Sequence, residues 1–135
     1  MDKSLRPQTG GDKQPHFAIA FQYCIFAPMN YDTIIVLCTC PDQESAGRIA
    51  THLVENRLAA CVNISAQVKS VYRWQGEIET ADECMLFIKT TASSYDELEM
   101  AVLSIHPYEL PEVLAVPVEN GLQNYLGWIN QCTNK

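Results

Sequence analysis

The sequence is poor in positive charge. Its 135 residues hold nine Lys and Arg against sixteen Asp and Glu, which gives a formal net charge of −7. Binding to nucleic acid or to an anionic membrane surface depends on clustered basic residues. The composition therefore argues against both of these roles, and the predicted partners include neither nucleic acid nor membrane.

A hydrophobic run long enough to cross a bilayer is also missing. The longest apolar stretch covers residues 17–29, whereas a spanning helix needs about 20 residues. The polar residues 1–16 before it contain a Gly-Gly pair and are typical of a flexible leader. Three interpretations of residues 1–30 stay open: a misassigned start with Met29 as the true initiator, which we favour, an extension packed on the domain, or a targeting segment. The folded domain is expected over residues 31–135.

Motifs of common catalytic and structural metal sites are absent. The chain has no GxGxxG, P-loop, nucleophile elbow or HExxH, and it lacks the Cys and His spacings of closed zinc sites. Cys38, Cys61 and Cys84 lie in apolar surroundings, as free buried thiols do. These features predict a protein without enzymatic activity in a reducing compartment.

What is present from residue 33 onward is an orderly alternation of strand and helix patterns. Strands are expected at 33–40, 61–74, 77–91 and 112–118, and helices at 43–57, from Ser93 or Ser94 to His106, and near 122–129. Asp42 is expected to cap the first helix, Asp96 or Glu97 to complete a capping box for the second, and Gln75-Gly76 to form a hairpin turn. The order βαββαβ with a short C-terminal helix predicts an α+β, ferredoxin-like fold with its helices on one sheet face.

The strand patterns also predict self-association. Residues 33–40, 84–88 and 113–118 are apolar in both phases of the strand, whereas an antiparallel sheet open to water alternates. Two helices cover only one face of such a sheet. We therefore expect a second copy of the chain to cover the other face, and predict an obligate homo-oligomer.

Several residue groups are able to carry chemistry. Cys38 and Cys40 share one face of a strand, and with the imidazole of His106 their thiolates suit copper or zinc; buried free thiols and a helix-ending His are the alternative. Tyr72 and Trp74 share a face, as cross-strand packing or as a wall of a ligand pocket. Lys89 follows apolar residues and needs a partner, for which Glu112 is a candidate.

Six stretches of the chain resemble the CutA family of divalent-cation tolerance proteins. The matching segments are Val36–Thr39 with Pro41-Asp42, Leu58–Asn63, Ser70–Gly76, Ile88–Thr90, His106–Glu112 and Tyr125–Trp128. The resemblance implies a ferredoxin-like fold, a P-II-like homotrimer, a cytoplasmic location, binding of copper or other divalent ions, and no settled enzymatic activity.

The resemblance also implies functional residues. Cys38 and His106 match positions to which copper binding is ascribed, but Ile105 replaces a second His found in some members, so we expect weak binding. Whether Cys38 and His106 share one site within a chain stays open. The alternative function is a signalling trimer that binds a small-molecule effector in clefts between subunits. The cleft positions are Tyr72, Trp74, Lys89, Tyr108, Glu112, Tyr125 and Trp128.

Overall fold

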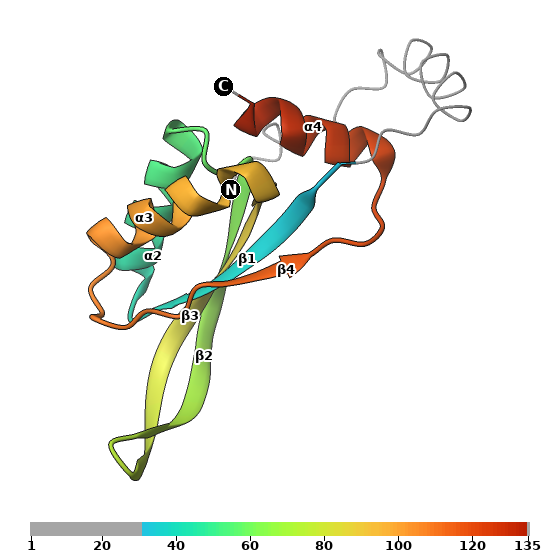
Figure 1. Ribbon diagram of the computed structural model, residues 1–135. Coiled ribbons are helices and arrows are strands. Elements are labelled where there is room, and N and C mark those ends of the chain that lie inside the picture. Colours follow the sequence, from blue (N-terminus) through green and yellow to red (C-terminus); the bar gives the residue numbers. More distant parts are fainter. Residues whose placement is uncertain (1–30, 135) are drawn as a thin grey trace.

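The computed structural model describes residues 31–134 and consists of a four-stranded antiparallel sheet with three helices (Figure 1). The strands lie side by side in the order β2-β3-β1-β4. This confirms the predicted α+β class and element order, and the predicted leader, residues 1–30, lies outside the described residues. The elements are β1 (Thr33–Cys40), α2 (Gln43–Glu55), β2 (Cys61–Trp74), β3 (Glu77–Thr91), a 3₁₀ turn (Ala92–Ser94), α3 (Tyr95–Ile105), β4 (Leu114–Pro117) and α4 (Gln123–Thr133).

The hydrophobic core lies between the sheet and the helix pair α2 and α3, which cover one sheet face side by side (Figure 1). Alternate residues of β1 and β3 point into this layer, where they meet the apolar stripes of the two helices. α4 lies apart from this pair, at the end of the sheet where β1 begins (Figure 1). Residues without solvent exposure at the centre of the core are Val36, Ile49, Leu53, Leu86, Ile88, Leu98 and Val102.

The local signals for helix and turn ends were mostly correct. Asp42 caps α2, because its Oδ1 accepts a 2.7 Å hydrogen bond from the Ser45 backbone N–H. The hairpin turns at Gln75-Gly76, where Gly76 has φ +82°. The capping box predicted for α3 is wrong: the Ser94 side chain makes no cap hydrogen bond, and its hydroxyl lies 3.3 Å from that of Thr91. The intervening 3₁₀ turn, Ala92–Ser94, leads into α3 instead.

The sheet face opposite α2 and α3 carries apolar side chains that one chain leaves open. Leu114 and Val116 of β4 pair with Leu37 and Ile35 of β1, so these four side chains share that face. Phe87 of β3, the partner of Leu37 on its other side, belongs to it as well. Leu114, Val116 and Phe87 are exposed and the β1 pair is half-buried. As predicted from the sequence, these strands carry apolar side chains on both faces of the sheet.

β2 and β3 continue past the end of β1 as a two-stranded arm, formed by residues 67–83 (Figure 1). β1 ends at Cys40, opposite Cys84, so the arm beyond that point has no third strand. Val71, Tyr72, Trp74 and Ile78 are exposed on it. An isolated two-stranded ribbon is only marginally stable in water, so the arm needs further contacts to be held in place.

Candidate functional site

Two thiols and one imidazole come together at the end of β1. The Sγ atoms of Cys38 and Cys40 and a ring nitrogen of His106 all lie within 4.8 Å of one another, and all three residues are buried. Strand alternation places the two cysteines on the helix-facing side of β1. His106 joins them because α3 ends directly above this point. The structure thus brings Cys38 and His106 together within one chain and adds Cys40.

Two backbone hydrogen bonds fix the His106 ring. Its Nδ1 accepts a 3.0 Å bond from the Tyr108 N–H, which can only donate. The ring hydrogen is therefore on Nε2, which donates to the Thr39 carbonyl at 2.8 Å and lies 3.9 Å from Cys40 Sγ. An Nδ1 that accepts this bond requires the neutral Nε2–H tautomer. A metal ion on either ring nitrogen must displace one of these bonds.

The two thiols do not ionise alike. Interaction with the neighbouring Cys40 thiol raises the pKa of Cys38, and burial raises it further. The same interaction lowers the pKa of Cys40. Glu83 and Glu112 add to the rise at Cys38. Cys40 therefore loses its proton more readily than Cys38.

A buried carboxylate borders this cluster. The Tyr108 hydroxyl donates a 2.8 Å hydrogen bond to Glu83 Oε2, and only 8% of Glu83 is exposed. The Tyr108 ring packs against the His106 ring with their centroids 5.0 Å apart. Burial and the Glu83 bond raise the pKa of Tyr108. Sequence reasoning missed Glu83, because an acidic residue beside Asp82 in a hairpin strand looks like any exposed polar position.

The seven predicted cleft residues do not form one site in a single chain. Lys89 Nζ lies 5.9 Å from the centre of the Tyr125 ring, and Tyr125 packs on Trp128 at 5.5 Å. Tyr108, by contrast, bonds to Glu83, six residues from Lys89 along β3 and so roughly 20 Å away.

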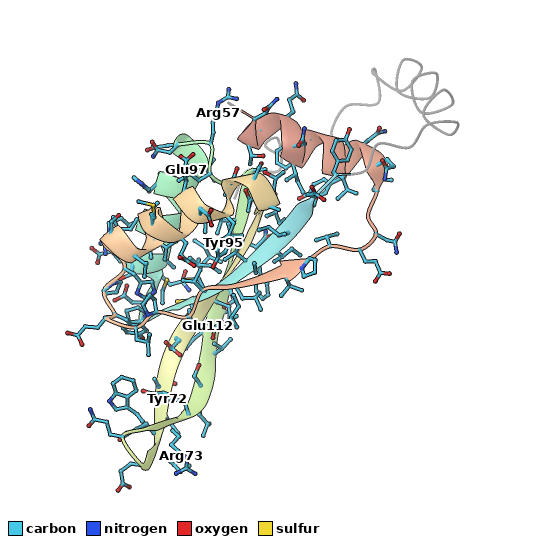
Figure 2. All side chains as sticks on the ribbon, viewed as in Figure 1. Arg57, Tyr72, Arg73, Tyr95, Glu97 and Glu112 are labelled. Atoms are coloured by element: carbon cyan, nitrogen blue, oxygen red, sulfur yellow. The ribbon has the colours of Figure 1, made fainter. Side chains whose placement is uncertain are left out.

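The remaining cleft residues follow the same division. Tyr72 and Trp74 are on the arm, where Figure 2 shows Tyr72, and Glu112 is in the segment leading to β4. No ion pair joins Lys89 and Glu112 within residues 31–134 of one chain, and their partnership stays a prediction. The seven residues thus gather at two ends of the sheet.

Comparison with known proteins places this chain in a family. The profile described as "CutA1 divalent ion tolerance protein" matches residues 34–132. The chain belongs to the CutA1 family. This confirms the resemblance carried by its sequence motifs.

Individual relatives agree with the family profile. The Divalent-cation tolerance protein CutA of Thermus thermophilus is 46% identical over 73% of this chain and 96% of its own length. Protein CutA of Mus musculus is 48% identical over 70% of this chain but 54% of its own length. The chain thus spans nearly all of the bacterial relative and about half of the mouse one.

Solved structures of the family share the fold. CutA from Xylella fastidiosa aligns with a TM-score of 0.75 and 46% identity over 76% of this chain and 99% of its own. CutA1 from Oryza sativa aligns with a TM-score of 0.75 and 39% identity over 78% of this chain and 96% of its own. A structure from Archaeoglobus fulgidus, TM-score 0.73 and 38% identity over 76% of this chain and 99% of its own, is described as a periplasmic divalent cation tolerance protein. Within residues 31–134 no helix is long and apolar enough to cross a membrane.

Proposed function

We propose that this protein serves divalent-metal tolerance, copper above all, and that it holds the ion weakly at Cys38, Cys40 and His106. The observation that carries the proposal is the convergence of these three ligand atoms within 4.8 Å in one chain. The family names of its relatives speak of divalent-cation tolerance. No catalytic step is part of this proposal, and the relatives' names state none.

The donor set suits a soft or borderline ion. Thiolate and imidazole ligands favour Cu(I), Cu(II) and Zn²⁺ over Mg²⁺ or Ca²⁺, which take oxygen ligands. Cys40 adds a third protein ligand to the two, Cys38 and His106, that the family resemblance implies. With Cys40 included the set matches the three-ligand minimum of an open metal site.

Weak binding follows from the state of the three ligands. Metal ions bind thiolates, so Cys38 must give up its proton although burial and the neighbouring Cys40 raise its pKa. His106 must exchange a backbone hydrogen bond for the ion. All three residues are buried, so the ion must also displace part of the loop that follows α3. Each requirement subtracts from the affinity of an otherwise suitable donor set.

Calorimetric titration with Cu(II), and with Cu(I) under reductant, tests the site. We expect affinity weaker than about nanomolar for the parent protein, and a fall of about ten-fold or more for each of Cys38→Ser, Cys40→Ser and His106→Ala. Cys132→Ser is the matched control, because Cys132 is a free thiol on α4, outside the cluster. If none of the three substitutions changed the copper affinity, the cluster would not be the metal site.

We further propose that the fold is of the ferredoxin-like kind and that three copies assemble as a P-II-like homotrimer in the cytoplasm. The apolar open face and the unsupported arm support the assembly, since both need contacts that one chain does not provide. Free thiols at all five described cysteines support a reducing compartment. The signalling alternative is not favoured, because the relatives' names describe cation tolerance and no observation here indicates an effector.

A further inference from the structure

We propose that Cys40 and Cys84 form a disulfide when the protein meets a hydroperoxide, and that this bond switches off the metal site by withdrawing Cys40 from it. The second half of the statement rests on the proposed function, while the first half stands on the geometry of the sheet alone. The sequence does not predict that Cys40 and Cys84 lie together, because 44 positions separate them.

The sheet register places the two cysteines directly opposite each other. Cys40 is the last residue of β1 and Cys84 is its antiparallel partner on β3. Directly paired residues have their side chains on the same face, with Cα atoms about 4.5–5.5 Å apart. Disulfides join Cα atoms that are about 4.4–6.8 Å apart. Because β1 ends at Cys40, the strand end is able to move the small distance that the sulfur atoms still require.

The other thiols are less suitable partners for Cys40. Cys38 is two residues away on the same strand, so its Cα is about 6.6 Å distant, at the upper limit for a disulfide. Cys61 pairs with Lys89, five residues along β3 from Cys84. Cys132 is on α4. Among residues 31–134, Cys84 is the best-placed partner.

Of the two paired thiols, Cys84 lies nearer the surface. It is buried, but its Sγ accepts a 3.3 Å hydrogen bond from Nε2 of Gln43, whose side chain is exposed. The same Gln43 amide donates to the Ser65 carbonyl at 2.9 Å, which holds it over the sulfur. Cys84 thus contacts a surface side chain and is 3% exposed, whereas Cys40 has no exposure at all.

The chemistry needs two steps and one hydroperoxide. One of the two sulfur atoms, as its thiolate, attacks the O–O bond, which breaks to give a sulfenic acid and, from hydrogen peroxide, one water. The sulfur atom of the other cysteine then attacks the sulfenic sulfur, the S–O bond breaks, and the oxygen leaves as a second water with the thiol proton. Two thiols are oxidised by two electrons in all and the peroxide is reduced. Cys38 and His106 are left as the only two ligands of the cluster.

Mass spectrometry of the full chain after hydrogen peroxide treatment tests the bond. We expect a loss of two hydrogen masses and a non-reduced tryptic link between peptide 74–89, which holds Cys84, and the peptide that holds Cys38 and Cys40. The link should persist in Cys38→Ser and Cys132→Ser and vanish in Cys40→Ser and Cys84→Ser. Gln43→Ala should speed its formation. A link between Cys38 and Cys40, or none, would overturn the proposal.

Cu(I) titration of the reduced and the oxidised protein tests the switch. We expect oxidation to weaken Cu(I) binding about ten-fold or more, and dithiothreitol to restore it. The Cys84→Ser variant should bind Cu(I) with the parent's affinity, and peroxide treatment should not change that affinity. Unchanged affinity in the disulfide form would refute the switch. If the reduced protein bound no Cu(I), the proposed function would fail, and the mass measurement would still decide the disulfide.

Discussion

Single hydrogen bonds from Tyr108 hold the loop after α3 against two different strands. Its backbone N–H bonds to His106, which in turn bonds to Thr39 on β1. Its hydroxyl bonds to the buried Glu83 on β3. A buried carboxylate that loses its partner costs more than the bond itself contributes, because the charge stays desolvated.

Tyr108→Phe is therefore expected to destabilise the protein by about 1–3 kcal/mol. The ring and its contact with His106 remain, so the change isolates the bond to Glu83. Urea unfolding monitored by circular dichroism measures the effect. Tyr95→Phe is the control: it removes a similar 2.6 Å bond to Glu99, but Glu99 is only half-buried. Equal losses in the two variants would show that burial of Glu83 adds nothing.

Residue patterns placed two of the three cluster residues together. Alternation along β1 is a local property, so the sequence placed Cys38 and Cys40 on one face correctly. His106 lies 66 positions after Cys40, and its approach depends on how α3 returns over the sheet. The sequence did not predict a role for Glu83 for the same reason. Its hydrogen-bond partner, Tyr108, lies 25 positions later. The metal role of all these residues stays a prediction.

At the scale of elements, the N-terminus of α2 makes the fold sensitive to acid. The carboxylate of Asp42 accepts hydrogen bonds from Ser45, and these lower its pKa. A group whose pKa is lowered by folding stabilises the fold above its unfolded pKa of about 3.9, and that contribution disappears as the pH falls through the folded value. The cap therefore supports α2 at neutral pH and is lost in acid.

Asp42→Asn should flatten this pH dependence. Asn caps helices about as well as Asp but does not titrate in this range. We expect the variant to be less stable than the parent at pH 7, where only the parent has a charged cap at the helix N-terminus, and the difference to be smaller at pH 3, which lies below the unfolded pKa of Asp42. Urea unfolding at the two pH values measures it. Asp96→Asn, in the first turn of α3 without an assigned cap bond, is the control; a parallel shift of both variants at both pH values would refute the role of the cap.

The elements themselves were largely predictable because each follows from a short-range period. The limits of β1, β2 and β3 agree with the strand patterns, and α2 ends two residues early, at Glu55. β4 is shorter than expected, Leu114–Pro117, since it pairs only with residues 34–37 of β1. The arm was not foreseen, because the strand pattern of residues 61–91 does not tell where β1 stops supporting it.

For the whole molecule, the open apolar face predicts assembly. We expect light scattering at micromolar concentration to give about 45 kDa, three times the chain mass of 15.1 kDa. The interface should be of the obligate class, above about 2,000 Å² in total. Deletion of residues 1–28 should leave this mass unchanged, because the open face and the arm belong to the described domain. A folded monomer would refute assembly. If the deletion abolished assembly, residues 1–28 would be needed to hold the subunits together.

The central position of β1 has a consequence for synthesis on the ribosome. β1 leaves the exit tunnel before any other described strand, yet one of its neighbours is β4, where Leu37 pairs with Leu114, 77 positions later. Such distant pairing is slow to form, and β1 offers a bare, hydrophobic edge until β4 has left the exit tunnel. The sheet therefore cannot be completed before that point of synthesis. A transcript truncated before the codon for Leu114 would yield a nascent chain prone to aggregation and dependent on chaperones.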